Sequence, residues 1–117
     1  MAVLRIISNF AAADPGKATR FYGEILNLDI VMDHGWIVTY AAGGKMVPQV
    51  SFAREGGSGT PVPDLSVEVD NLDEIHRRMI DAGFEIDYPI TAEPWGVRRF
   101  FVRDPFGRLV NILSHGH

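Results

Sequence analysis

Hydrophobic residues in the first half of the chain recur at spacings that predict one helix among four strands. Residues 3–12 form a largely apolar run with a polar break at Ser8-Asn9, which is long enough for a strand. Asp14 and Pro15 then supply a helix cap and a first helical residue. Apolar residues follow at helical spacing as far as Asn27, a residue that tolerates the left-handed end of a helix. The predicted elements are a strand at 3–12, a helix at 14–27, and strands at 28–32, 36–42 and 46–53.

The second half repeats this pattern after a Gly- and Pro-containing linker at 55–62. Asp70 follows Asp14 by 56 positions, and Gly83 follows Asn27 by the same interval, so the caps and the stops of both helices recur. Such a repeat predicts a duplicated supersecondary unit, the alternative being two capped helices of equal length by coincidence. The half-units are expected at about 3–54 and 63–114, the second with a strand at 64–69, a helix at 70–83, and strands at 84–88, 97–103 and 109–113.

The last two strands are joined by Asp104-Pro105-Phe106-Gly107, a sequence typical of a tight turn. Asp accepts from nearby backbone N–H groups at the first turn position, Pro fixes φ at the second, and Gly suits the fourth. The flanking runs are rich in β-branched and aromatic residues, which favour strands. The stretch therefore predicts a hairpin that completes the second half.

Alternation along the strands separates an apolar face from a mixed one, because successive side chains point to opposite sides. Leu65, Val67 and Val69 are expected to pack on the helices. Phe100 and Val102 alternate with Arg99, Phe101 and Arg103, although the side of this strand is the least constrained. The mixed face has the composition of a small-molecule site, with a solvated sheet or a partner-covered face as alternatives. Its members are Ile7, Asn9, Gln49, Ser51, Asp64, Ser66, Glu68, Phe101, Leu109, Asn111 and Leu113.

Length and composition fit one globular domain over residues 1–117. A net charge of −4 argues against a nucleic-acid partner, since phosphate contact needs a basic stripe. The longest apolar runs fall short of the roughly 20 residues of a membrane span, and the first residues lack the layout of a signal peptide. With no Cys there is neither a disulfide framework nor a thiolate nucleophile. A cytoplasmic location, without membrane or nucleic-acid partners, is the expectation.

Three stretches together resemble the glyoxalase/bleomycin resistance protein/extradiol dioxygenase superfamily, also called vicinal oxygen chelate (VOC). They are DPGKATRFYGEILNL at 14–28, VEVDN at 67–71 and PWGVRRFFVRDPFGRLVNIL at 94–113, and they span nearly the whole chain. The resemblance implies an α+β fold in which two βαβββ units form a curved, cup-like mixed sheet with helices on its outer face. It says little about the reaction, because these motifs mark the fold.

Catalytic members of the superfamily bind a divalent metal through His, Gln or Glu at four strand positions. Carried over position by position, these are Ile7, Gln49 (approximately), Asp64 and Asn111. An aliphatic side chain cannot coordinate, and neutral amides are weak ligands for Zn, Ni or Fe. We therefore expect no metal cofactor. The alternative is a weakly bound divalent ion such as Zn, Ni, Mn or Fe on Gln49, Asp64 and Asn111.

The resemblance favours a metal-free small-molecule-binding homodimer of the bleomycin-resistance type, which sequesters its ligand without chemistry. Aromatic side chains would stack on a flat ligand, and Arg98 or Arg99 would pair with an anionic one. Phe106 is a further available ring. The ligand residues expected from the mixed face and these side chains are Ile7, Asn9, Trp36, Tyr40, Gln49, Ser66, Trp95, Arg99, Phe101 and Asn111.

Two other functions remain open at this stage. In the first, the protein is a glyoxalase-like lyase or isomerase, or a dioxygenase-related enzyme, in which Asp64 and Glu68 perform acid–base catalysis with or without a metal. A carboxylate in an apolar cup can have a raised pKa, which would suit that role. In the second, the protein is a module whose polar face is buried against a partner. The four histidines are poor candidates for a general base, since they fall in a turn (His34), on the outward side of a helix (His76) and at the chain end (His115, His117).

Overall fold

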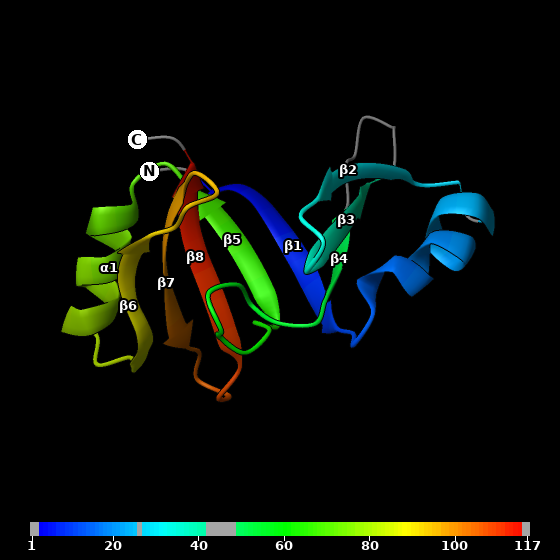
Figure 1. Ribbon diagram of the computed structural model, residues 1–117. Helices are drawn as coiled ribbons and strands as arrows, with labels where there is room; N and C mark the ends of the chain where they lie inside the picture. The colour runs from blue at the N-terminus through cyan, green and yellow to red at the C-terminus, as the bar shows by residue number, and fades with distance from the viewer. Residues whose placement is uncertain (1–2, 26, 42–48, 116–117) are drawn as a thin grey trace. The chain divides into compact units, whose positions relative to one another are not determined.

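The computed structural model describes residues 3–25, 27–41 and 49–115, which form two compact units (Figure 1). The N-terminal unit comprises residues 7–62. The C-terminal unit combines the chain up to Ile6 with residues 63–117. The chain passes from the N-terminal to the C-terminal unit after Val62, and the first strand contributes to both units. The predicted turn at 43–45 and the beginning of the strand predicted at 46–53 lie outside the described residues.

The N-terminal unit has the order strand, helix and three strands that the sequence predicts. Its strands are arranged β2-β3-β4-β1, with β1 parallel to β4 and the other neighbours antiparallel. Asn9 is paired with Ser51, and Thr39 is paired with the same Ser51 from the other side. The elements are β1 (Val3–Ala11), η1 (Pro15–Lys17), η2 (Thr19–Ile25), β2 (Asp29–Asp33), β3 (Ile37–Ala41) and β4 (Gln49–Ala53).

The first helix departs from the regular pattern that the sequence suggests. It consists of a 3₁₀ turn, η1, followed by a π-helical segment, η2. Asp14 precedes it in an extended conformation without a capping hydrogen bond from its side chain. Asn27 adopts φ 56°, the left-handed stop that the sequence predicts. None of the residues of η2, all of them described, is buried, although the half-buried ring of Tyr22 packs against Tyr40 and Phe52.

The predicted linker is a folded loop at the end of the N-terminal unit. The backbone N–H of Gly56 donates to the carbonyl of Thr60 at 2.7 Å, and the Thr60 hydroxyl donates to the carbonyl of Gly57 at 2.8 Å. The carboxylate of Glu55 accepts from the N–H of Gly59 at 3.0 Å. These bonds fix the loop, so the segment is more ordered than its composition suggests.

The C-terminal unit repeats the same order of elements with a regular helix. Its strands are arranged β5-β8-β7-β6, with β5 parallel to β8 and the other pairs antiparallel. Gly83 ends the helix with φ 86°, where a side chain would be strained. β6 is longer than the predicted strand, since it continues through Pro89 to Ala92. The elements are β5 (Leu65–Val69), α1 (Leu72–Asp81), β6 (Ile86–Ala92), β7 (Val97–Arg103) and β8 (Leu109–His115).

The core of the C-terminal unit lies between α1 and the sheet, and Figure 1 shows α1 against β6 and β7. This confirms that Phe100 and Val102 face the helix. Two expectations were wrong. Leu65, at the start of β5, is 36% exposed and lies outside the core cluster. The residue at the N-cap of α1 is Asn71 instead of Asp70. The buried cluster consists of Val69, Leu72, Phe100, Val102 and Ile112, against which Val67, Ile75, Met79, Ile86, Ile90 and Val110 pack.

Over the described part of the chain the elements give an α+β fold with eight strands of mixed direction, as the sequence predicts. None of the helices in the described residues is both long and apolar enough to cross a membrane.

Candidate ligand-binding site

Buried polar side chains line the face of the C-terminal unit that lies opposite α1. We call this the polar face. The β5–β8 register aligns Ser66 with Asn111, and the β7–β8 register aligns Asn111 with Phe101. Arg99 and Glu68 align in the same way on either side of Leu113. Ser66, Arg99 and Asn111 are all buried, although polar residues of these types usually remain exposed.

Arg99 of this face forms an ion pair with Glu93, which lies in the turn between β6 and β7. Nε of Arg99 donates to Oε2 of Glu93 at 2.6 Å, and the Tyr88 hydroxyl donates to the same oxygen at 2.9 Å. Both charged side chains are at most 3% exposed. A turn holds Glu93 in place, because its N–H donates to Val97 and its carbonyl accepts from Gly96. Removing one partner of such a buried pair would leave an uncompensated charge, which is strongly destabilising.

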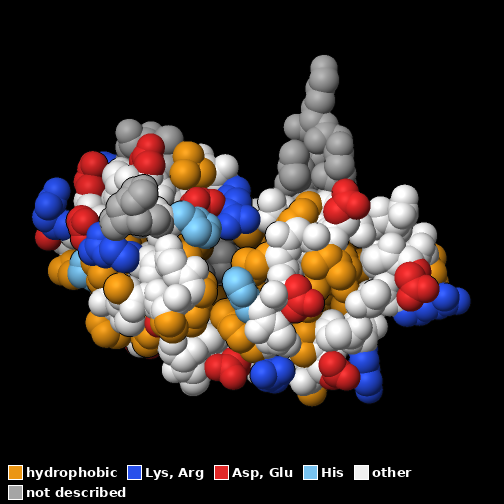
Figure 2. Space-filling view, turned by 45° about the horizontal axis from the view of Figure 1, so that its top comes forward, with side chains coloured by type: hydrophobic (Ala, Val, Ile, Leu, Met, Phe, Trp, Pro, Cys, Tyr) orange, Lys and Arg blue, Asp and Glu red, His pale blue; other side chains and the backbone are white. Residues whose placement is uncertain are grey.

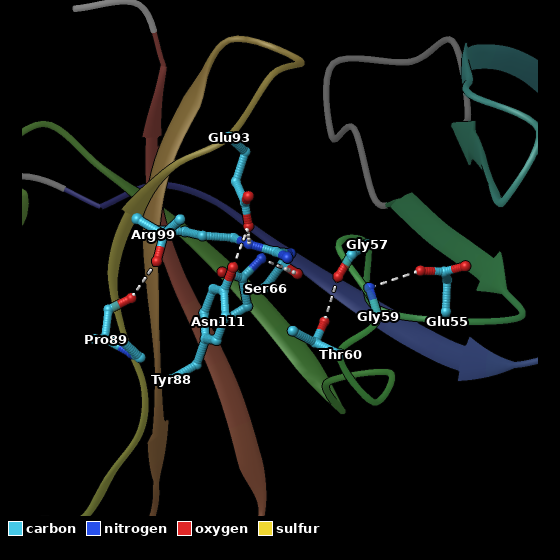
Figure 3. A network of polar contacts seen from close by, with 11 residues as sticks. Glu55, Gly57, Gly59, Thr60, Ser66, Tyr88, Pro89, Glu93, Arg99 and Asn111 are labelled. Carbon is cyan, nitrogen blue, oxygen red and sulfur yellow. Dashed lines mark hydrogen bonds and ion pairs between the residues drawn. The ribbon is translucent and has the colours of Figure 1, made fainter.

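Three aromatic rings surround the Arg99 guanidinium. Its Cζ lies 5.3 Å from the ring centroid of Tyr88, 5.0 Å from that of Trp95 and 4.8 Å from that of Phe101. Distances of this size allow cation–π attraction. Figure 3 shows Arg99, Glu93 and Tyr88 converging near Ser66 and Asn111. We call Tyr88, Glu93, Trp95, Arg99 and Phe101 the Arg99 cluster.

Asn111 contributes a buried amide that is only partly satisfied. Its Nδ2 donates to Oγ of Ser66 at 3.1 Å. Its Oδ1 is inaccessible to solvent and has no hydrogen-bond partner among the described residues. A buried acceptor without a donor costs about 1–3 kcal/mol, so this oxygen is an unsatisfied position on the polar face.

Glu68 lies at the end of the polar face in a network that joins three strands. Nε of Arg5 donates to its Oε1 at 2.5 Å, and Nδ1 of His115 lies 2.8 Å from its Oε2. Burial raises the pKa of Glu68, but the hydrogen bonds from His115 and Arg5 outweigh burial and hold the pKa below its usual value. The expectation of a raised carboxylate pKa was therefore wrong for Glu68.

Beside this network, a hollow of about 510 Å³ reaches the first turn of α1. Its lining includes Glu68, His115 and Arg98. Arg98 donates to both carboxylate oxygens of Asp73 at 3.0 and 3.3 Å, and this contact lowers the pKa of Asp73. Arg98 therefore lies on the α1 side of the sheet. This position does not favour the ion pair that was expected between Arg98 and an anionic ligand.

The residues at the metal positions of the superfamily do not fit a metal ion. Ile7 is buried and aliphatic. The carboxylate of Asp64 accepts from the N–H of Leu109 at 3.2 Å and so secures the start of β8. Asn111 offers one neutral oxygen. Within residues 3–25, 27–41 and 49–115, no three His, Asp or Glu side chains lie close enough to hold a metal ion.

In the N-terminal unit, Asn9 and Ser51 lie on one buried face together with Ile7. Thr39 Oγ1 lies 2.7 Å from Ser51 Oγ in that face. Gln49 is half-buried at the start of β4. Tyr40 points to the other side, where it is fully buried against Tyr22 and Phe52, so it is a core residue and the expectation of a ligand contact there is not supported. Trp36 stacks on His34 with ring centroids 6.3 Å apart.

Sequence reasoning missed several members of these networks. Tyr88 and Glu93 lie in segments assigned to a short strand and a loop, and only the fold brings them to Arg99. His115 was treated as part of a chain end, but it belongs to β8. His76, expected to point outward, is half-buried with its ring edge-on to Phe100 at 4.8 Å. His117 lies outside the described residues. No local signal marks Glu93, because its burial follows from the turn that its backbone forms with Gly96 and Val97.

Charged side chains of both signs are interspersed on the face shown in Figure 2. The chain carries 15 acidic and 11 basic residues, and no basic stripe is visible on that face.

The chain is similar to known proteins in its sequence pattern and in its fold. The family model of the Glyoxalase/Bleomycin resistance protein/Dioxygenase superfamily matches residues 6–112. No curated protein sequence matches the chain at a significant level.

Several solved structures share the fold at low sequence identity. A Legionella pneumophila structure described as an NAD-dependent benzaldehyde dehydrogenase is 18% identical with a TM-score of 0.75, covering 95% of this chain and 99% of that one. A superfamily member from Vibrio splendidus 12B01 is 14% identical with a TM-score of 0.63, covering 97% and 99%. A Staphylococcus aureus protein is 17% identical with a TM-score of 0.66, covering 98% and 99%. These structural similarities show the fold alone. Because the family model matches most of the length of the chain, the chain belongs to the glyoxalase/bleomycin resistance protein/dioxygenase superfamily.

Proposed function

We propose that this protein binds a small organic molecule on the polar face of its C-terminal unit, without a metal ion, and sequesters it. The observation that carries the proposal is the Arg99 cluster, in which three aromatic rings and a buried ion pair lie beside Ser66 and Asn111. Mostly apolar walls with a few fixed polar groups are typical of small-molecule sites. The rings favour a flat ligand, because stacked or edge-on aromatic contacts add to the energy of burial.

The residues themselves support binding without a metal. The superfamily places its metal on side chains that donate strongly, whereas the corresponding positions here include an aliphatic side chain and two amides. Asp64, the one carboxylate among them, already accepts a backbone hydrogen bond. Organic contacts therefore replace metal coordination in this proposal.

The binding proposal is tested by recording ¹H–¹⁵N spectra during titration with a flat aromatic probe such as 2-naphthol. The indole N–H of Trp95 and the side-chain amide of Asn111 are expected to shift in a saturable way, with chelator present throughout. Trp95→Ala should weaken binding about tenfold through loss of ring contact. Phe106→Ala, which removes a ring that is 88% exposed, is the matched control and should leave the affinity unchanged. Binding that is insensitive to Trp95→Ala would contradict this site.

The enzyme alternative makes a different prediction for the same protein. If Asp64 or Glu68 performed acid–base catalysis, Asp64→Asn or Glu68→Gln would abolish turnover of a bound compound. In a sequestering protein the same substitutions change affinity or stability only. The lowered pKa of Glu68 keeps it ionised at neutral pH, which gives less support to a general acid at that position.

We also propose that the protein is a cytoplasmic homodimer. Exposed apolar side chains on one side of β1, namely Leu4, Ile6 and Phe10, support the dimer, since such groups commonly mark protein contacts. Light scattering should then give twice the chain mass of 13.0 kDa. Ile6→Glu is expected to yield monomers, whereas Ile80→Glu, at an α1 side chain that is 52% exposed, is the matched control. A monomeric mass for the unmodified protein would reject the dimer.

A further inference from the structure

One side of η2 faces the sheet of the N-terminal unit, and its other side is uncovered. On the inner side, the ring of Tyr22 packs on that of Tyr40 with centroids 6.0 Å apart. Gly23 points the same way, because a Cβ there would lie 3.6 Å from the Tyr40 ring. Phe21 and Ile25 lie two residues to either side of Gly23, about half a helical turn away, and are 55% and 62% exposed. Two large apolar side chains therefore point away from the unit.

The charges beside these apolar side chains are self-complementary. Nη1 of Arg20 lies 3.3 Å from Oε1 of Glu24, and the two side chains are 77% and 58% exposed. Arg20 precedes Phe21 and Glu24 precedes Ile25, so both pairs have the same spacing of four residues. When a second η2 lies antiparallel to the first across a two-fold axis, Arg20 of each copy meets Glu24 of the other. Phe21 then meets Ile25 in the same way. A parallel arrangement would bring like charges together.

A chain of ring contacts connects η2 with the dimer surface proposed on β1. The ring centroids of Phe21 and Tyr22 are 4.8 Å apart, and those of Tyr22 and Phe52 are 4.7 Å apart. The ring of Phe52 in turn stacks on that of Phe10 at 5.8 Å. Phe10 is 53% exposed, belongs to the proposed dimer surface and lies in the same unit as η2. The apolar surface of this unit therefore continues from β1 to η2.

We infer that η2 is part of the homodimer interface and packs antiparallel on η2 of the second copy. The inference rests on the proposed homodimer and specifies a surface that the dimer buries. A second copy is favoured over a different protein, because one segment supplies an apolar pair and two opposite charges in an order that complements itself. η2 has only seven residues, whereas a stable interface buries roughly 1,200–2,000 Å² in total. The η2 contact therefore adds to the contact through β1.

Charge reversal tests this contact, with the dissociation constant of the dimer measured by light scattering over a dilution series. Arg20→Glu places like charges opposite each other at two equivalent points and should weaken the dimer about tenfold. Glu24→Arg should do the same. An equimolar mixture of these two variants has opposite charges between chains, although each chain keeps like charges along its own helix. The mixture should dimerise about as tightly as the unmodified protein. Arg78→Glu, in the exposed Glu74–Arg78 pair on α1, is the matched control and should leave the constant unchanged.

Cysteine pairing tests the antiparallel arrangement without relying on charge. The chain has no Cys, so a single introduced one can form a disulfide only with another copy. A disulfide requires its two Cα atoms to lie within about 7 Å of each other. A mixture of Phe21→Cys and Ile25→Cys chains should therefore form the mixed disulfide several-fold faster than either variant pairs with itself. Pairing of either variant with itself that is as fast as mixed pairing would overturn the arrangement.

The dilution series separates this inference from the homodimer on which it rests. If the unmodified protein is a monomer, the homodimer fails and the inference fails with it. If it is a dimer whose constant neither charge variant changes, the homodimer stands and only the η2 contact is overturned. If both variants are weakened and their mixture is not restored, the loss comes from the helix itself, and the inference is also overturned.

Discussion

The two units share one order of elements but differ in how their sheets are covered. In the C-terminal unit, Leu72, Ile75 and Met79 of α1 pack on a core that contains the fully buried Phe100. In the N-terminal unit, η2 buries none of its described residues, and Phe21 and Ile25 are more than half exposed.

The two units also differ in their buried polar side chains. The N-terminal unit carries a neutral hydroxyl pair, Thr39 and Ser51, whereas the C-terminal unit carries a buried ion pair beside an open acceptor. A desolvated charge pair is costly to maintain and requires a firm surrounding structure. The comparison teaches that two units with the same order of elements can diverge, with one of them providing a buried ion pair and the other a neutral hydroxyl pair.

The largest expected effect is on the core that distinguishes the units. Phe100→Ala should lower the free energy of unfolding by about 3–5 kcal/mol, because a fully buried ring leaves a cavity. Phe10→Ala, at a ring that is 53% exposed, should cost far less. Denaturant unfolding of both variants measures the difference. Equal losses would mean that Phe10 is buried in solution, for example by a partner.

Breaking the buried ion pair should be nearly as costly. Glu93→Gln leaves the Arg99 charge uncompensated, and a loss of about 3 kcal/mol is expected. The double variant Glu93→Leu with Arg99→Met removes both charges and should be closer to the parent protein than Glu93→Gln. A double variant that is less stable than the single one would show that the pair itself, and not the avoidance of a lone charge, stabilises the unit.

The N-terminal counterpart should respond more weakly. Thr39→Val removes one hydroxyl of the buried Thr39–Ser51 pair and is expected to cost about 1–2 kcal/mol. Calorimetric or denaturant unfolding gives the value. A loss as large as that for Glu93→Gln would remove the energetic contrast between the two polar faces.

The smallest expected effect is on the way the free energy of unfolding changes with pH in acid. The folded pKa of Glu68 is lowered, so its contribution is present above the unfolded value, near 4.5, and is lost as the pH falls through the folded pKa. Glu68→Gln should therefore flatten the stability curve below about pH 4.5. Glu85→Gln, at an exposed residue between α1 and β6, is the matched control and should leave the curve unchanged. A steeper acid limb in Glu68→Gln would contradict the assigned direction.

The sequence predicts most of the fold because the fold depends on local signals. Asn27 and Gly83 end their helices in the left-handed conformation, as residue type alone suggests, and alternation places Phe100 and Phe101 on opposite faces. The family resemblance through 94–113 is confirmed by the match over residues 6–112.

The site was predicted only in part, because it depends on contacts between distant segments. Nothing local to Glu93 or Tyr88 shows that both reach Arg99. The network of Arg5, Glu68 and His115 joins three strands, so its effect on the Glu68 pKa cannot be read from alternation. Tyr40 was misassigned because the bulky ring of a site and that of a core look alike in sequence.

The central claim is that an organic ligand binds the polar face of the C-terminal unit without a metal ion. The most direct measurement is a titration of ¹⁵N-labelled protein with 2-naphthol in the presence of chelator, monitored at the Trp95 indole and the Asn111 amide. The account predicts saturable shifts of both signals that are the same with and without added divalent metal. Shifts that require metal, or no shift at either residue up to saturating probe, would contradict it.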